Sequence, residues 1–109
     1  MNFYKKSSQL SYVDFIQRLN RDVWTLSEQG RSSFEKFKIN PQRFKSKNIS
    51  LSELDEIFVV AQSNQDIIVF DENVDQFGIG EFTKDNVVRT WCILGTLDYC
   101  LNQLEDRNF

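Results

Sequence analysis

The sequence contains no histidine, so the most common general base of enzymes is missing. Catalysis by Ser-His or Cys-His pairs and metal binding through imidazole are excluded with it. No apolar run approaches the roughly 20 residues that a membrane-spanning helix needs. Met1 to Lys6 lead into Ser7-Ser8-Gln9 rather than into the apolar segment of a signal peptide. We therefore expect a cytoplasmic protein that has no membrane segment and is not an enzyme.

Cysteine is scarce, with only Cys92 and Cys100 in the chain. We expect both to lie in one C-terminal helix, where a separation of eight residues places their Cα atoms about 12 Å apart. A disulfide tolerates a separation of about 7 Å. The sequence therefore predicts two reduced, packed thiols.

The chain is nevertheless rich in groups that build a core. Of 109 residues, 40% are hydrophobic and 14% aromatic, with ten phenylalanines. A chain of this length and composition is typical of one folded domain, and we find no internal repeat or linker. We expect residues 1–109 to form a single domain.

Two short apolar runs, Ile57 to Ala61 and Ile67 to Phe70, are rich in β-branched and aromatic residues. Such runs predict strands, and the polar segment Gln62 to Gln65 between them predicts a hairpin turn. Because the runs are continuous rather than alternating, both faces of these strands should be covered. The capping-box spacing of Ser52 and Asp55 predicts a turn or short helix from Leu51 to Glu56, just before the first strand.

A third strand is predicted from Gln76 to Phe82. Phe77 and Ile79 should face one side of it, and Gly78 and Gly80 the other. Alternate glycines indicate a bulge or the close approach of another backbone.

Two long helices are predicted around these strands. Ser11 and Asp14 have the spacing of a capping box, and Gly30 suits a helix end, so the first helix should occupy the chain between them. Asp85 should cap a final helix that contains Gly95 in its middle. The apolar residues that define this helix are Val87, Trp91, Leu94, Leu97, Leu101 and Leu104. We predict an α+β fold, with a small antiparallel sheet of about three to four strands packed against a long N-terminal and a long C-terminal helix.

Charge is divided unevenly along the chain. Up to Ser50 there are ten basic and four acidic residues, and from Leu51 onward there are three basic and twelve acidic residues. Such asymmetry indicates a charged partner rather than a particular fold.

The basic segment 31–47 contains Phe34, Phe37 and Phe44 among six basic residues. Aromatic rings interleaved with cations are typical of proteins that bind single-stranded nucleic acid. The alternative is a short helix whose core side holds Phe34 and Phe37 and whose lysines face water. We favour the alternative, because no recognisable nucleic-acid motif accompanies the cluster.

Asp71, Asn73 and Asp75 share the one-three-five spacing of a calcium loop. The match ends there, because Gln76 and Phe82 occupy the positions where such a loop needs glycine and glutamate. We expect no metal, no cofactor and no catalytic carboxylate pair.

The acidic half instead suggests electrostatic binding. Carboxylates near the strand ends would present a negative surface to a basic protein partner, although an acidic surface also simply keeps a small protein in solution. The expected contact residues are Asp66, Asp71, Glu72, Asp75 and Glu81, with Phe77 or Tyr99 as aromatic anchors.

Size, composition and charge together favour a non-catalytic, protein-binding inhibitor. A bacterial immunity protein that neutralises a toxin, for example a nuclease, has these properties. The alternatives are a nucleic-acid-binding module that uses residues 31–47, and a phage-encoded inhibitor of a host nucleic-acid enzyme.

Overall fold

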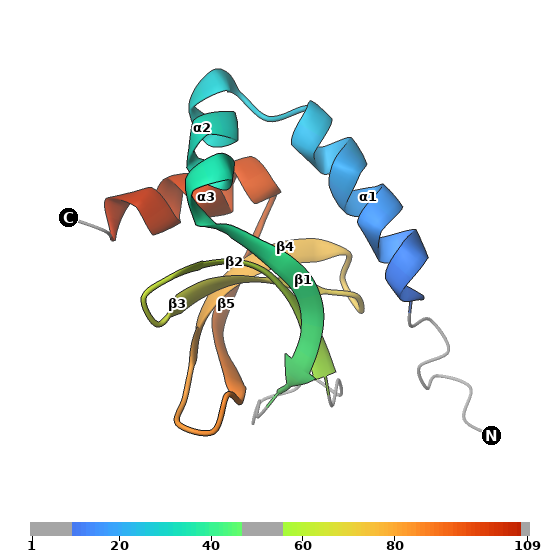
Figure 1. The fold of residues 1–109 in the computed structure, drawn as a ribbon, viewed down its shortest axis with the longest axis vertical. Coiled ribbons are helices and arrows are strands. Elements are labelled where there is room, and N and C mark those ends of the chain that lie inside the picture. The colour runs from blue at the N-terminus through green and yellow to red at the C-terminus, as the bar shows by residue number, and fades with distance from the viewer. Residues whose placement is uncertain (1–9, 47–55, 108–109) are drawn as a thin grey trace.

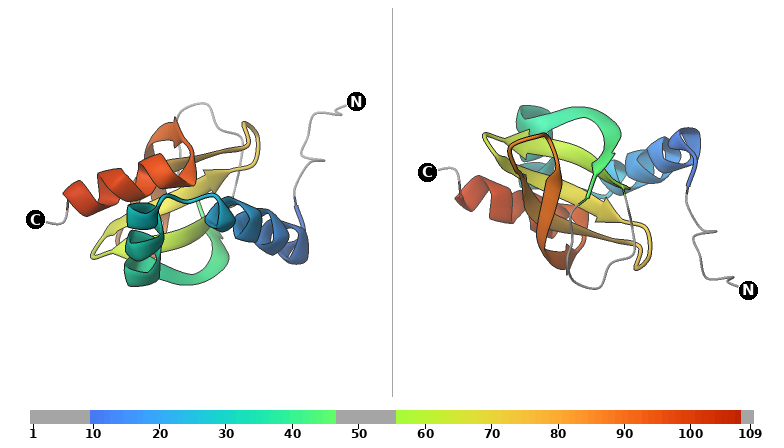
Figure 2. Two further views of the ribbon diagram at one scale, coloured as in Figure 1. Left: turned by 90° about the horizontal axis from the view of Figure 1, so that it is seen from above. Right: turned by 90° about the horizontal axis from the view of Figure 1, so that it is seen from below.

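The computed structural model describes residues 10–46 and 56–107. In chain order the elements are α1 (Tyr12–Trp24), α2 (Glu28–Phe37), β1 (Lys38–Lys45), β2 (Glu56–Ser63), β3 (Asp66–Asp71), β4 (Gln76–Phe82), β5 (Val88–Gly95) and α3 (Leu97–Asp106). The five strands form one antiparallel sheet in the order β1-β2-β3-β4-β5. Figures 1 and 2 show the helices gathered on one side of it. The predicted α+β class and antiparallel sheet are confirmed, but there are five strands rather than three to four.

The sheet is strongly curved, and its two edge strands meet at one end. Ser46, just after β1, forms an isolated parallel bridge with Val88 at the start of β5. The curvature encloses a small apolar cluster on the concave face, separate from the main core beneath the helices. The buried members of the concave cluster are Ile57, Val59, Ile67, Val69 and Val88.

The two strands of the first hairpin are buried on both faces, as their continuous apolar runs predicted. In β2, Phe58 and Val60 face the helices while Ile57 and Val59 face the concave cluster. The β2–β3 register shifts between Val59 and Ala61, so Ala61 also joins the main core. A bulge of this kind adds one residue and bends the strand. The predicted turn is present, since Asn64 adopts a φ of 60° between β2 and β3.

The glycines of β4 allow β5 to approach closely, which confirms their predicted role. A Cβ atom on Gly78 would collide with the carbonyl oxygen of Cys92, and one on Gly80 with that of Arg89. Two register shifts between β4 and β5 accompany this approach. Side chains larger than hydrogen would therefore push β5 away from the sheet.

The predicted long C-terminal helix is wrong in its first half. Residues Val88–Gly95 form β5, and the helix α3 begins only at Leu97, where the Thr96 hydroxyl accepts a hydrogen bond from the Tyr99 amide at 3.2 Å. Gly95, expected inside the helix, ends the strand with a φ of 119°. Tertiary pairing with β4 overrides the helical spacing of the apolar residues.

The cysteines consequently lie on different elements. Cys92 is exposed on β5 and Cys100 is buried in α3, and both are free thiols. Burial raises the pKa of the Cys100 thiol to about 12. Both thiols are free, as predicted, but Cys92 is exposed rather than packed, and the argument from a single helix was wrong.

The N-terminal helix is shorter than predicted, because a second helix starts before Gly30. The Ser11 cap is confirmed by a hydrogen bond from the Asp14 amide to its hydroxyl at 3.0 Å, but α1 ends at Trp24. Ser27 caps α2 by accepting from the Gly30 amide at 3.0 Å. Gly30 is therefore in the first turn of α2 rather than at a helix end. The turn or short helix predicted over 51–56 lies outside the described residues, apart from Glu56 at the start of β2.

Candidate functional site

A cleft opens where α1, the β3–β4 turn and the start of α3 meet. Its volume is about 490 Å³. The residues that line it are Arg18, Asp22, Thr25, Leu26, Asp75, Gln76, Phe77, Gly95, Thr96, Leu97 and Asp98. Three separate parts of the chain thus supply its walls, and we call it the acidic cleft.

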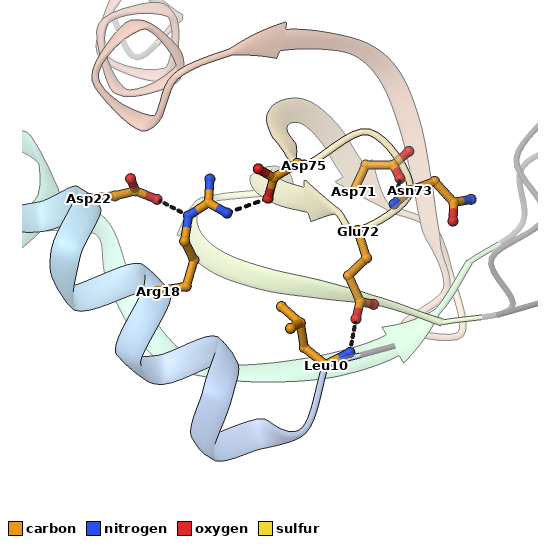
Figure 3. Close-up of polar contacts among 7 residues, drawn as sticks. All are labelled: Leu10, Arg18, Asp22, Asp71, Glu72, Asn73 and Asp75. Carbon is orange, nitrogen blue, oxygen red and sulfur yellow. Dashed lines mark hydrogen bonds and ion pairs between the residues drawn. The ribbon is translucent and has the colours of Figure 1, made fainter. Parts of the chain in front are cut away.

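Carboxylates outnumber cations in the acidic cleft. Asp22, Asp75 and Asp98 line it together with one basic residue, Arg18. The Arg18 guanidinium contacts Asp22 at 2.9 Å and also donates to Asp75, as Figure 3 shows. Burial alone would lower the pKa of Arg18, but the hydrogen bonds to Asp75 and Asp22 outweigh it and raise that pKa. Arg18 therefore stays charged, and the cleft keeps an excess of negative charge.

Asp98 holds the α1–α2 connection against α3. Its carboxylate accepts hydrogen bonds from the Ser27 hydroxyl at 3.0 Å and from the Ser27 amide at 3.3 Å. Because Ser27 is the N-cap of α2, the negative charge lies at the positive end of that helix. The absence of a side chain at Gly30 leaves room for the carboxylate.

The β3–β4 turn presents Asp75 in a fixed position. The Asp71 side chain accepts from the Asn73 amide at 2.8 Å, and the Asp75 amide donates to the Asp71 carbonyl at 2.8 Å. Asp75 has a φ of 59°, a left-handed conformation that aspartate tolerates better than most residues. The Asp75 side chain remains 69% exposed in spite of its contact with Arg18.

Glu72, in the same turn, has a structural role. Its side chain is only 2% exposed and accepts from the Leu10 amide at 2.6 Å (Figure 3). The Arg43 guanidinium donates to both of its carboxylate oxygens, at 2.8 and 3.1 Å. This one carboxylate therefore connects the start of α1, strand β1 and the β3–β4 turn, and it is not available to a partner.

The predicted contact residues fall into two groups at opposite ends of the β3–β4 hairpin. Asp71, Glu72 and Asp75 occupy its turn, whereas Asp66 and Glu81 lie opposite each other at its other end. A strand of six residues separates these ends by about 17 Å.

The second group is paired within the chain. Arg107 lies 3.7 Å from the Asp66 carboxylate, and Arg89 lies 3.3 Å from that of Glu81. Together with the contacts of Glu72 and Asp75, four of the five predicted carboxylates have an arginine partner. The predicted acidic surface is therefore largely neutralised from within. Of its carboxylates, Asp75 alone lines the acidic cleft, where Arg18 is shared between Asp75 and Asp22.

The two predicted aromatic anchors have opposite surroundings. Phe77 is buried in the main core, with its ring centroid 4.9 Å from that of Phe70, so it supports the cleft from below. Tyr99 is exposed on α3, next to the cleft residue Asp98. Only Tyr99 is accessible to a partner.

Exposed apolar side chains flank the lining residues of the cleft. Trp24 precedes Thr25, Val74 precedes Asp75 and Tyr99 follows Asp98. All three are among the most exposed large hydrophobic residues of the described chain. Each of the three chain segments that line the cleft therefore carries both a carboxylate and an exposed apolar side chain.

The basic segment 31–47 has no exposed phenylalanine ring where the structure describes it. Phe34 and Phe37 lie on the side of α2 that is buried in the main core. The partly buried Phe44 ring packs edge-on against the Phe82 ring, with 4.8 Å between the ring centroids. The interpretation of Phe34 and Phe37 as the core side of a short helix is confirmed. Lys47, the end of the segment, lies outside the described residues.

Within residues 10–46 and 56–107, no group of three or more Asp, Glu or Cys side chains has the geometry of a metal site. The calcium-like spacing of Asp71, Asn73 and Asp75 does not bring these side chains together. Asp71 faces the Asn73 amide while Asp75 faces Arg18 (Figure 3).

The sequence indicated only part of this cleft. Asp75 and Phe77 were predicted as contacts and line it, and the predicted Tyr99 follows the lining residue Asp98. Arg18 and Asp22 offered no signal of a site, because their four-residue spacing is explained by a local ion pair. Asp98 carried no signal, since its role depends on Ser27, 71 positions away in the chain.

No helix in the part of the chain that the structure describes is long and apolar enough to cross a membrane. Comparison with known proteins finds no matching protein family, no matching curated protein and no matching solved structure.

Proposed function

We propose that this protein is a non-catalytic inhibitor that binds a basic protein partner through the acidic cleft, as a bacterial immunity protein binds its toxin. The observation that carries this proposal is the cleft itself, in which three carboxylates meet one arginine. A lysine or arginine of the partner would supply the missing positive charge. Charge-assisted hydrogen bonds of this kind are shorter and stronger than neutral ones.

Asp75 is the central residue of the proposed contact. It is fixed by the turn geometry, yet its side chain is 69% exposed. A partner cation could therefore approach it while Arg18 remains bound to Asp22 on the other side. Such preorganisation lowers the entropic cost of ordering the side chain on binding.

The flanking apolar residues support a protein rather than a small cation as the ligand. Val74 and Tyr99 are exposed apolar residues next to the lining residues Asp75 and Asp98 in the chain. Tryptophan and tyrosine are enriched among the residues that dominate protein interfaces, where charged groups surround them. The contact surface we propose is thus narrower than the predicted one, and it omits Glu72, Phe77, Asp66 and Glu81.

The partner class follows from charge. A toxin that acts on nucleic acid has a basic surface for phosphate, and an acidic inhibitor can cover that surface in the cytoplasm. A phage-encoded inhibitor of a host nucleic-acid enzyme would use the same electrostatics with a different target.

The test uses affinity capture from the native cells, followed by mass spectrometry and by calorimetric titration of the purified partner. We expect a protein with a basic surface whose affinity falls about tenfold for Asp75→Asn. The matched control is Asp85→Asn, which removes the same charge from an exposed turn residue that does not line the cleft. Equal affinity of both variants, or capture of nucleic acid alone, would contradict the proposal.

A further inference from the structure

A second hollow lies between α1 on one side and α2 with the start of β1 on the other. Its volume is about 500 Å³, and it adjoins a smaller hollow of about 250 Å³. Asn20 lines both, so the two lie next to each other, and we call them together the α1 groove. The residues that line it are Tyr12, Ile16, Leu19, Asn20, Val23, Trp24, Arg31, Phe34, Lys38, Ile39, Asn40 and Pro41.

Helix α1 leaves three of its seven apolar side chains exposed. Phe15 and Leu19 are buried and Ile16 and Val23 are partly buried against the main core, whereas the exposed ones are Tyr12, Val13 and Trp24. Tyr12 is 52% exposed and Trp24 is 77% exposed, and both line the groove. A helix of a globular protein normally buries one apolar face, and exposed apolar patches mark interaction sites. The groove therefore has the composition of a surface that another chain covers.

The spacing along α1 suits a helical ligand. Tyr12, Ile16, Asn20 and Trp24 recur every four residues, so they form a row along the helix. Twelve residues of helix are about 18 Å long, which matches about three turns of a second helix packed alongside.

The charge of the α1 groove is opposite to that of the acidic cleft. Arg31 and Lys38 are its charged lining residues, and among the described residues no carboxylate lines it. Arg31 donates to the Trp24 backbone carbonyl at 3.3 Å, which holds its guanidinium at the part of the groove that Trp24 also lines. Lys38 is half-exposed and contacts Glu35 at 3.0 Å, outside the groove lining. An acidic ligand is therefore complementary to this surface.

We propose that the α1 groove binds an acidic amphipathic helix of a protein partner, whose apolar side chains fill the groove and whose carboxylates face Arg31 and Lys38. This site is separate from the acidic cleft and does not depend on the function proposed for it. A single-stranded nucleic acid fits less well, because it needs a line of cations along its backbone and flat rings for its bases. The groove floor is instead formed by Ile16, Leu19 and the buried Phe34.

The test uses the full chain with Trp91→Phe, which leaves Trp24 as the only tryptophan. The probe is a synthetic helical peptide of about four turns with leucines at helical spacing and glutamates elsewhere. Its binding should shift the Trp24 emission to shorter wavelength in a saturable manner. The paired substitutions Arg31→Glu and Lys38→Glu should weaken binding about tenfold, whereas Lys84→Glu, an exposed charge outside the groove, should leave it unchanged.

Three results would overturn the proposal. The first is equal binding of the same peptide with lysines in place of glutamates, since apolar contact alone would then account for it. The second is that oligothymidine binds and the peptide does not, with loss of DNA binding on Arg31→Glu, which would assign the groove to nucleic acid. The third is a dimer in sedimentation that dissociates on Trp24→Ala, since a second copy would then occupy the groove.

Discussion

The basic N-terminal half and the acidic C-terminal half of the chain differ strongly in charge, and the fold brings them into contact. The sequence suggested that such a division serves a partner. Among residues 10–46 and 56–107, three ion pairs instead join a base of the first half to an acid of the second. These pairs are Arg43–Glu72, Lys36–Glu105 and Arg18–Asp75. Much of the asymmetry therefore holds α1, α2 and β1 onto the β3–β4 turn and α3.

The three pairs differ in how far their carboxylates are exposed. The exposed fraction is 2% for Glu72, 29% for Glu105 and 69% for Asp75. Removing one partner of an ion pair lowers stability strongly only where the remaining charge is buried and cannot be hydrated. Exposed ion pairs contribute little to stability. Substitution of each acid should therefore reveal a graded loss of stability across the boundary between the halves.

The largest effect is expected for Glu72→Ala. It leaves the Leu10 amide without its acceptor and the Arg43 guanidinium, which still donates to the Leu10 carbonyl, without its carboxylate partner. We therefore expect the free energy of unfolding to fall by about 2–4 kcal/mol. Urea denaturation measures this change.

The control for this substitution is the double variant Arg43→Met with Glu72→Leu, which removes both charges and should recover part of the loss. A loss below about 0.5 kcal/mol for Glu72→Ala would show that this pair does not join the two halves.

An intermediate effect that depends on pH is expected for Glu105→Gln. The hydrogen bond from Lys36 at 2.7 Å, and after it that from the Ser33 hydroxyl at 2.6 Å, lower the pKa of Glu105 below its ordinary value of 4.5. Because the pKa is lowered in the folded state, the unfolded chain takes up this proton at a higher pH than the folded chain does. The stabilisation is therefore complete above pH 4.5 and is lost as the pH falls through the lowered pKa.

Thermal unfolding from pH 2 to pH 7 tests this expectation. The wild-type Tm should exceed that of Glu105→Gln at pH 7, and the difference should shrink on acidification. Asp106→Asn, a change at the exposed neighbouring residue, is the control and should leave the acid limb of the profile unaltered. A difference that grows as the pH falls would contradict the assignment.

The smallest effect on stability is expected for Asp75→Asn. Asparagine tolerates the left-handed conformation at this position, and an exposed ion pair is worth about 0.5 kcal/mol. Urea denaturation should therefore be almost unchanged, while binding to a basic partner should weaken as proposed above. A large loss of stability would place Asp75 with Glu72 among the structural carboxylates and would remove the main support for the cleft as a binding site.

The strands were predictable where composition and periodicity agreed. Ile57 to Ala61 and Ile67 to Phe70 are too short for buried helices and too apolar for a half-exposed sheet, so two covered strands were the consistent solution. The C-terminal region was not predictable in the same way. Leucines and tryptophan between Trp91 and Leu104 repeat at helical spacing, but the first part of this segment pairs with β4 instead.

The glycines of β4 were the available signal for this pairing. Gly78 and Gly80 indicated a close neighbouring backbone, but they did not say which segment would provide it. The cleft was hidden for a related reason. Ser27 and Asp98 each have a local role at a helix start, and nothing nearby in the chain indicates that they contact each other.

The sequence by itself determined the α+β class, the covered hairpin of β2 and β3, the Ser11 cap and the charge of each half, because these depend on composition and on neighbours within a few residues. Only the tertiary structure decided that Val88–Gly95 is a strand, that Glu72 is buried and that Asp75 remains exposed beside Arg18. The physical reason is that strand pairing and the desolvation of a charge depend on groups far away in the chain, whose positions no local pattern specifies.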